Sequence, residues 1–258
     1  MDSFPTPALV LRTRDLDAAD RLVTLLTPAR GRIVCAAKNA RKSFKRFGGC
    51  LNLFSEIQAE VTVREGRELG RLESAVLLEP FEDLRRGWRT LAIAATGIEL
   101  VDRIAHGTEE ASALYRVTRG FLRAVGAAAG DPGPGGADAR ALTAFELRVL
   151  AHAGFRPELL HCVVCGRGAT DRKVARTFDL HRGGLLCPAC AKADAGTGRG
   201  GRLLTLTDTA RAALAAMLAG EPDDPAACPP KARAECAGLV NALITERLGT
   251  PLKTWSVL

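Results

Sequence analysis

Two Cys-x-x-Cys pairs, separated by 21 residues near the middle of the chain, constrain the fold more than any other feature. Together they offer four thiolates, which is the full tetrahedral ligand set of a structural zinc ion. Gly166 directly follows the first pair and gives the backbone the freedom that such a tight knuckle needs. The interval is slightly longer than that of common zinc ribbons. The spacing predicts one zinc ion with four ligands: Cys162, Cys165, Cys187 and Cys190.

The predicted zinc site is closed, which argues for a structural role. A catalytic zinc keeps one position open for water and usually has three protein ligands. The Cys-Pro-Ala-Cys motif is similar to part of the zinc deaminase signature, but that chemistry also needs a His-x-Glu. None of the four histidines is followed two residues later by Glu, and His161 and His181 are expected to be spectators. A zinc-dependent hydrolase or deaminase stays open as the less favoured alternative.

The chain carries no visible export or membrane signal. Its first residues, MDSFPTPALVLRTRD, lack a basic segment followed by an apolar one. No apolar run approaches the roughly 20 residues that a membrane helix needs. We therefore expect a cytoplasmic protein with reduced thiols, without a membrane partner. The remaining cysteines lack pair spacing and are expected at small buried positions; they are Cys35, Cys50, Cys228 and Cys236.

The net charge of +7 is concentrated in two segments. Residues 21–55 hold eight Lys or Arg and no acid, and residues 160–202 hold eight against three Asp. Clustered positive charge favours a polyanionic partner, most often nucleic acid. A merely solvated basic surface is the alternative.

The N-terminal third predicts strands. Five apolar or alternating segments lie within residues 7–79 and are separated by turn residues: PALVLRT, RLVTLLT, GRIVCAAK, NLFSEIQAEVTVRE and LGRLESAVLLEP. This strand count suits an OB-fold β-barrel, a common platform for nucleic acid. We predict an OB-fold nucleic-acid-binding domain at 1–80.

Helical periodicity follows Pro80. Apolar residues recur at helical spacing from Leu84 through Trp88, Leu91, Ala95, Ile98 and Val101. Further helices are expected at 110–125, 140–153, 206–220 and 231–248, and loops at 126–139 and 196–201. The predicted fold is α+β, with an all-helical domain at 81–258 that carries the zinc module at about 160–195.

The segment AAKNARKSFKRFGG at 36–49 is the strongest functional candidate. Its cations can pair with phosphates, and its aromatic residues can stack on unpaired bases, although one of Phe44 and Phe47 is expected to pack in the core. The predicted DNA-binding residues are Lys38, Arg41, Lys42, Phe44, Lys45 and Arg46. A second basic surface is expected on the zinc module, with Arg167, Arg172, Lys173, Arg176 and Arg182.

Motifs of the common enzyme classes are missing. The sequence has no G-x-x-x-x-G-K-[ST], no G-x-G-x-x-G after a strand and no G-x-S-x-G. We therefore expect no catalysis and no nucleotide cofactor.

Over nearly its whole length the sequence resembles the RecO family of bacterial recombination mediators. The resemblance rests on ALVLRTRDLDAADRLVTLLTPARGRIVCAAKNARKSFKRFGGCLNLFSEIQAEV and on ELRVLAHAGFRPELLHCVVCG leading into GGLLCPAC. Asn39 departs from the family pattern, in which a glycine often follows the lysine of the third strand.

The resemblance implies an OB barrel, a helical domain and a zinc module, acting in the RecFOR pathway of DNA repair. It implies binding of single- and double-stranded DNA, annealing of complementary strands, and help in loading the recombinase onto strands coated by single-stranded-DNA-binding protein (SSB). It also implies two protein partners, RecR and the C-terminal tail of SSB. A pure adaptor, whose basic surfaces bind acidic protein tails, remains an alternative.

Overall fold

The computed structural model places the chain in two compact units, one of Met1–Pro132 with Lys253–Leu258 and one of Gly133–Leu252. The structure describes residues 2–64, 66, 69–105, 109–128, 137–168, 177–197, 201–221 and 227–257. Most of the loop expected at 126–139, and part of that at 196–201, lie outside these residues. Among the described helices, none combines the length and apolar character needed to cross a membrane.

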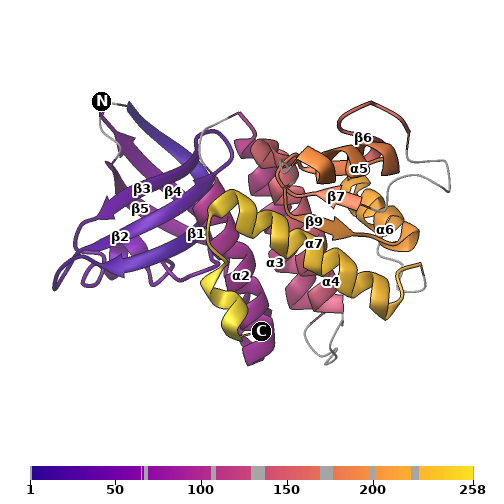
Figure 1. The fold of residues 1–258 in the computed structure, drawn as a ribbon. Coiled ribbons are helices and arrows are strands. Elements are labelled where there is room, and N and C mark those ends of the chain that lie inside the picture. The colour runs from indigo at the N-terminus through magenta and orange to yellow at the C-terminus, as the bar shows by residue number, and fades with distance from the viewer. Residues whose placement is uncertain are drawn as a thin grey trace. The chain divides into compact units, whose positions relative to one another are not determined.

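The first unit is built on five strands that close into a barrel in the order β1–β2–β3–β5–β4 (Figure 1). The strands are β1 (Asp2–Asp15), β2 (Arg21–Thr27), β3 (Gly31–Ala37), β4 (Glu56–Val63) and β5 (Leu69–Glu79). β3 and β5 pair in parallel, and the other neighbouring strands pair antiparallel. The OB-type barrel expected from the sequence is thereby confirmed.

The barrel core consists of the inward-facing side chains of its strands. Those with at most 1% exposure include Val23, Leu25, Ile57, Val61 and Leu72. β1 pairs with β4 through its first half and with β2 through its second half, and a bulge between Val10 and Arg12 interrupts its register with β2. Such a bulge bends a strand, which helps one long strand to close a small barrel.

A short helix, α1 (Phe44–Phe47), follows β3 and packs against the barrel core. Phe47 is 1% exposed and belongs to that core, whereas Phe44 is 81% exposed. One aromatic of the pair therefore packs inside, as expected. The fourth strand starts at Glu56 rather than at Asn52, because the residues between them form a turn in which Phe54 has a φ of 74°.

Helices α2 (Trp88–Ile104) and α3 (Ala111–Ala127) pack on the barrel within this unit, as does the C-terminal 3-10 helix η3 (Lys253–Val257) on α2. Trp88 is 70% exposed and Leu91 41% exposed, although both belong to the apolar pattern that predicted this helix. Leu84 lies in a separate 3-10 helix, η1 (Glu82–Arg85), and the extended Gly87 separates it from α2. The helical phase therefore does not continue from Leu84 to Trp88.

The second unit combines helices with a small sheet. Helices α4 (Ala137–Leu150), α6 (Asp208–Ala219) and α7 (Pro230–Leu248) pack together, and α4 runs into the π-turn η2 (Ala151–Phe155). Four short strands form a sheet in the order β6–β8–β7–β9: β6 (Glu158–Cys162), β7 (Thr177–Asp179), β8 (Gly184–Leu186) and β9 (Leu203–Thr205). The helical domain is confirmed, and these strands, which the sequence did not predict, are too short to show a periodicity.

The expected division into domains 1–80 and 81–258 stays a prediction. α2 and α3 follow residue 80 in sequence but belong to the compact unit of the barrel.

Candidate nucleic-acid interface and metal centre

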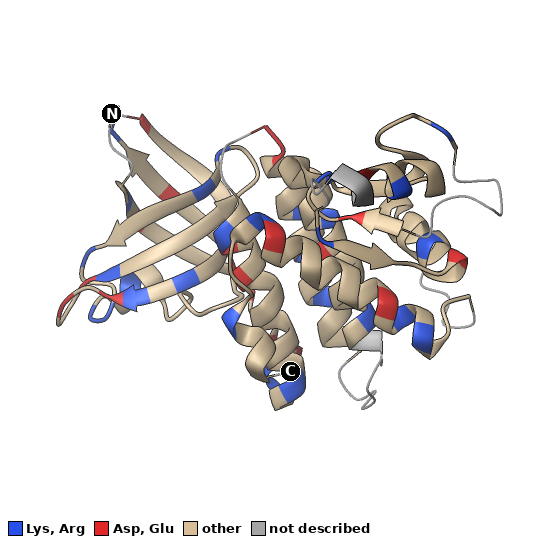
Figure 2. Cartoon of the chain, viewed as in Figure 1, with Lys and Arg blue, Asp and Glu red and all other residues tan. Residues whose placement is uncertain are grey.

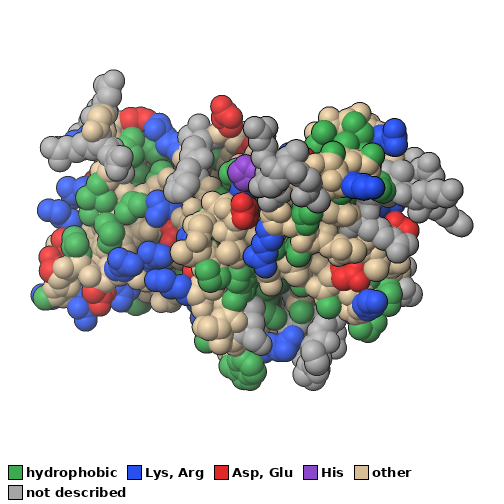
Figure 3. Space-filling view, in the orientation of Figure 1, with side chains coloured by type: hydrophobic (Ala, Val, Ile, Leu, Met, Phe, Trp, Pro, Cys, Tyr) green, Lys and Arg blue, Asp and Glu red, His purple; other side chains and the backbone are tan. Residues whose placement is uncertain are grey.

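The predicted DNA-binding residues lie in one stretch between β3 and the end of α1, residues 38–46, hereafter the basic loop. Five of the six side chains are exposed: Lys38, Arg41, Lys42, Phe44 and Lys45. Figure 2 marks Lys and Arg residues along the barrel, with Asp and Glu among them, and Figure 3 shows basic side chains on the face of the barrel in view. The loop therefore offers cations and one exposed aromatic ring on a single short segment.

Arg46 is placed differently from the other five. Its Nε donates a hydrogen bond of 2.8 Å to the Glu73 carbonyl of β5, and its guanidinium lies 4.8 Å from the ring centre of Phe47. The side chain is only partly exposed. Arg46 thus anchors α1 to the barrel.

The backbone of the basic loop is tied to the loop between β1 and β2. The Asn39 N–H donates to Oδ1 of Asp20 at 2.7 Å, and the Arg41 N–H donates to the Ala19 carbonyl at 3.0 Å. Asn39 has a φ of 58°, in the left-handed region that glycine adopts most readily and asparagine tolerates. This conformation explains why either glycine or asparagine can occupy this position.

Acidic side chains lie beside the basic loop. Arg41 pairs with Asp15 at 3.6 Å. The pKa of Asp17 is lowered by backbone N–H groups of Ala19 and Asp20, with Lys38 and Lys42 adding to the effect. Counting charge by segment missed these acidic neighbours of the basic loop. Asp15, Asp17 and Asp20 lie around the loop between β1 and β2 and precede the basic segment 21–55 in sequence.

The four predicted zinc ligands come together in the second unit. Their sulfur atoms all lie within 4.8 Å of one another, and Sγ of Cys165 lies 3.7 Å from Sγ of Cys187. A tetrahedral zinc with bonds of about 2.3 Å to sulfur requires sulfur–sulfur separations of about 3.8 Å. The donor set and its geometry therefore fit a closed site of four thiolates.

Local structure positions these cysteines. Cys162 ends β6, Cys187 follows β8, and Cys190 lies in the first turn of α5 (Pro188–Thr197). Gly166 has a φ of 72°, which is the left-handed conformation expected of the knuckle glycine.

Backbone amides stabilise thiolate at Cys162. Burial raises the pKa of this thiol, but hydrogen bonds from the N–H groups of Cys187, Cys165 and Val164 outweigh burial and lower it to about 6. The pKa of Cys190 is raised to about 12, first through its hydrogen bond with Cys187. A bare cluster therefore resists carrying several negative charges at once, which a divalent cation would neutralise.

The two nearby histidines are engaged elsewhere. His161 Nδ1 lies 3.6 Å from Glu158 and His181 Nδ1 lies 3.7 Å from Glu246. Among the described residues, the metal-binding group contains the four cysteines and neither histidine.

The expected basic surface of the zinc module is only partly described. Arg167 is exposed, whereas Arg172, Lys173 and Arg176 lie outside the described residues. Arg182 pairs with Asp179 and Asp194 and so holds β7 to α5.

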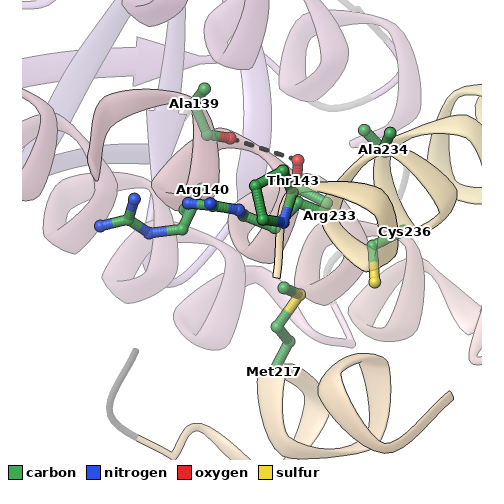
Figure 4. Close-up of a pocket in the computed structure, with 9 residues that line it drawn as sticks. Ala139, Arg140, Thr143, Met217, Arg233, Ala234 and Cys236 are labelled. Atoms are coloured by element: carbon green, nitrogen blue, oxygen red, sulfur yellow. Dashed lines mark hydrogen bonds between the residues drawn. The ribbon is translucent and has the colours of Figure 1, made fainter. Parts of the chain in front are cut away.

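A cavity of about 360 Å³ lies between α4, α6 and α7 (Figure 4). Met217 of α6 lies across from Arg140 and Thr143 of α4, and Cys236 and Arg233 come from α7. The lining is mainly apolar, with two arginines. Sequence reasoning missed this cavity, because three separate helices contribute to it.

Two family models cover almost the whole chain. The model described as recombination protein O N terminal matches residues 1–81, and that described as recombination protein O C terminal matches residues 85–256. DNA repair protein RecO of Myxococcus xanthus is 30% identical over 254 residues, covering 98% of this chain and 96% of its own length. RecO of Anaeromyxobacter sp. strain Fw109-5 is 36% identical over 95% of this chain and 91% of its own length. RecO of Syntrophotalea carbinolica is 37% identical over 74% of this chain and 70% of its own length. With both models matched in order and relatives aligned from end to end, the chain belongs to the RecO family.

Proposed function

We propose that this protein is a non-enzymatic recombination mediator in DNA repair, which works in the cytoplasm at the nucleoid. In this role it binds single- and double-stranded DNA, anneals complementary strands and helps to load the recombinase onto SSB-coated strands. Membership of the RecO family supports the role in repair. The observation that carries DNA binding is the exposed basic loop on an OB-type barrel.

The basic loop suits an unpaired strand. Lys38, Lys42 and Lys45 are exposed cations that pair with phosphates, and the ring of Phe44 is free to stack on a base. An aromatic ring exposed over four-fifths of its surface contributes little to folding, so its position beside lysines favours a role in binding.

The zinc ion in this proposal is structural. One ion bound by Cys162, Cys165, Cys187 and Cys190 would join β6, β8 and α5, and it would leave no position open for a substrate. A zinc-dependent hydrolase or deaminase is the least favoured alternative, because four thiolate ligands leave no open position on the zinc ion.

RecR and the acidic C-terminal tail of SSB are the proposed protein partners. The cavity between α4, α6 and α7 has a mainly apolar lining that includes Arg140 and Arg233, which suits an acidic peptide with an apolar residue. We therefore propose that the SSB tail binds in this cavity. If the basic loop bound acidic tails instead of DNA, the protein would be the adaptor of the alternative hypothesis.

DNA binding is tested by the salt dependence of binding to a labelled single-stranded oligonucleotide. Neutralising about five phosphates gives a slope of roughly −3.5 in log affinity against log salt. The triple variant Lys38→Gln, Lys42→Gln and Lys45→Gln should lower affinity and reduce the steepness of the slope by about 2. Arg46 is left intact because its role in the barrel would confuse folding with binding.

The matched control is Lys192→Gln, Lys231→Gln and Lys253→Gln, which removes the same charge from exposed lysines elsewhere. An equal loss in both triple variants would mean that only net charge matters, and would remove the basic loop from the argument.

Competition between the labelled oligonucleotide and a labelled tail peptide separates the mediator from the adaptor. If the protein is a mediator, Arg140→Ala with Arg233→Ala lowers the affinity for the peptide and leaves the affinity for the oligonucleotide unchanged. The basic-loop triple variant lowers the affinity for the oligonucleotide and leaves the affinity for the peptide unchanged. Displacement of one ligand by the other, with loss of both in the basic-loop variant, would favour the adaptor.

A further inference from the structure

The basic loop lies against the turn between β1 and β2, which carries three aspartates. This turn, Asp15–Asp20, is hereafter the acidic turn. Its own conformation is closed by the hydrogen bond from the Leu16 N–H to the Asp20 carbonyl and by Oδ1 of Asp17, which accepts the N–H groups of Ala19 and Asp20 at 2.7 Å each. The acidic turn is therefore an ordered structure that presents its carboxylates in set directions.

One aspartate of the acidic turn positions the basic loop. Oδ1 of Asp20 accepts the Asn39 N–H at 2.7 Å, directly at the residue with the left-handed φ. The Asn39 carbonyl in turn accepts the N–H groups of Lys42 and Ser43, at 3.1 and 2.8 Å. Asp20 thus holds the residue on which the turn before α1 is built.

The other two aspartates supply negative charge to the cations. Asp15 lies 3.6 Å from Arg41 and 3.1 Å from Arg21. The N–H groups of Ala19 and Asp20 are the main cause of the lowered pKa of Asp17, and the positive charges of Lys38 and Lys42 lower it further. Three of the cations assigned to phosphate therefore already have a carboxylate nearby.

We infer that Asp15 and Asp17 act as internal competitors of the DNA phosphates at the basic loop, and that Asp20 positions the loop for the strand. This inference rests on the proposed DNA binding. A phosphate that approaches Arg41 or Lys42 must replace or tolerate a carboxylate of the acidic turn. The acidic turn thereby lowers the affinity for DNA and keeps DNA binding reversible, as annealing and strand transfer require.

The physical consequence is that neutralising different aspartates of one turn has opposite effects. A carboxylate about 7 Å from a phosphate repels it by enough, in water, to weaken binding about threefold. The repulsion is screened over about 10 Å at 0.1 M salt, so the gain from removing it is largest at low salt. Removing the hydrogen bond between the Asn39 N–H and Asp20 instead makes the basic loop less ordered, and this weakens DNA binding.

The experiment measures affinity of the full-length protein for a single-stranded oligonucleotide across a salt series. Asp15→Asn with Asp17→Asn should tighten binding on the order of fivefold at low salt and steepen the slope by up to about 0.7 for each further phosphate paired. Asparagine keeps the oxygen that accepts backbone N–H groups, so the turn is expected to stay folded. Thermal unfolding of each variant checks this.

The matched control is Asp2→Asn, which removes one charge and is compared with Asp15→Asn and Asp17→Asn as single variants. Asp2 is 58% exposed in an ion pair with Arg30, much as Asp15 is 53% exposed in its pair with Arg21, but Asp2 stands at the opposite end of β1. It should leave affinity and slope unchanged. Equal tightening in the control would reduce the effect to net charge and overturn the inference.

Positioning by Asp20 is tested with two substitutions. Asp20→Ala should weaken binding several-fold, whereas Asp20→Asn, which retains an oxygen for the Asn39 N–H, should restore it. Binding that is equal in Asp20→Ala and wild type would overturn the positioning role.

The outcomes separate the inference from the proposed function. If the wild type binds and the basic-loop triple variant does not, but the Asp15/Asp17 variant is unchanged or weaker, the competition is wrong and DNA binding stands. If the wild type binds no oligonucleotide at any salt concentration, both fail together.

Discussion

Tyr115 Oη donates a hydrogen bond of 2.6 Å to Oε1 of Glu56, joining α3 to the start of β4. Oε2 of the same carboxylate accepts the Arg119 Nε at 2.7 Å. The Glu56 side chain is only 5% exposed, so its charge is compensated inside the first unit by a phenol and a guanidinium. A second polar link joins the barrel to α2, where Asp102 pairs with Arg12 at 2.7 Å and Arg32 at 2.8 Å.

Loss of the Tyr115 hydroxyl should destabilise the protein. A hydrogen bond to a buried charged group contributes about 2 kcal/mol, so Tyr115→Phe should lower the free energy of unfolding in urea by about that amount. Ser112→Ala, which removes an exposed hydroxyl bonded to Arg116 on the same helix, serves as the control and should cost less than about 0.5 kcal/mol. Equal effects of the two substitutions would contradict the assignment.

The same tyrosine gives an alkaline pH dependence. Burial, followed by the hydrogen bond to Glu56, raises the pKa of Tyr115 above its ordinary value of 10.0. Above pH 10 the unfolded chain loses this proton while the folded protein keeps it, so the stabilisation is complete below pH 10 and declines as pH rises. The difference in unfolding free energy between wild type and Tyr115→Phe should therefore shrink between pH 9 and 11. A constant difference would rule out this linkage.

The C-terminal helix η3 should depend on ionised Glu99. Oε1 of Glu99 accepts the Lys253 N–H at 3.0 Å, and Oε2 accepts the Thr254 N–H and hydroxyl at 3.0 and 2.9 Å. Burial raises the pKa of Glu99, but these hydrogen bonds outweigh it and leave the pKa below 4.5. The stabilisation is present above pH 4.5 and is lost as pH falls through the lowered pKa.

Hydrogen exchange of the Lys253 and Thr254 amides measures this contact. Protection should fall in Glu99→Gln at neutral pH and in the wild type at acid pH. Glu221→Gln, an exposed glutamate of the second unit, should leave both amides unchanged. Full protection in Glu99→Gln would show that packing alone holds η3.

If the four cysteines hold the proposed zinc ion, a chelator should loosen the segment around them and leave the barrel folded. Four thiolates in a closed site contribute binding free energy to folding, so a chelator should increase exchange in β6 and β8 far more than in β1 and β2. Cys165→Ser should reduce the metal content, whereas Cys50→Ala, in the barrel core, should leave it at one ion per chain. Turnover that a chelator abolishes in a still-folded module would instead support the hydrolase.

The two phenylalanines of α1 should separate stability from binding. Phe47→Ala removes a buried ring and should cost about 3–5 kcal/mol of folding free energy. Phe44→Ala should leave the unfolding free energy unchanged within about 0.5 kcal/mol. It should weaken the binding of single-stranded DNA by about 1–3 kcal/mol. Unchanged DNA binding in Phe44→Ala would remove this ring from the interface.

Features of short range were predictable from the sequence. The cluster of four cysteines that could hold a metal ion follows from two local spacings, because each Cys-x-x-Cys turn brings its own pair of sulfurs together. The five barrel strands and the helices follow from side-chain periodicity between turn residues. Short strands such as β7 and β9 escaped, since three residues carry no period.

Contacts between distant segments were decided by the tertiary structure alone. Leu84 and Trp88 share no helical face because the extended Gly87 separates η1 from α2, and Arg182 is paired because Asp179 of β7 and Asp194 of α5 both lie beside it. Arg46 anchors α1 because a β5 carbonyl lies beside it.

The basic loop shows the division most clearly. Its lysines and the exposed Phe44 stand in one segment, so the sequence by itself determined that a basic, partly aromatic loop follows the third strand. That Asp15, Asp17 and Asp20 lie against it was decided by strand pairing, because β2 pairs antiparallel with both β1 and β3 and so places the loops after β1 and β3 at the same end of the barrel. Electrostatic energy depends on distance in space, and the spacing along the chain does not contain it.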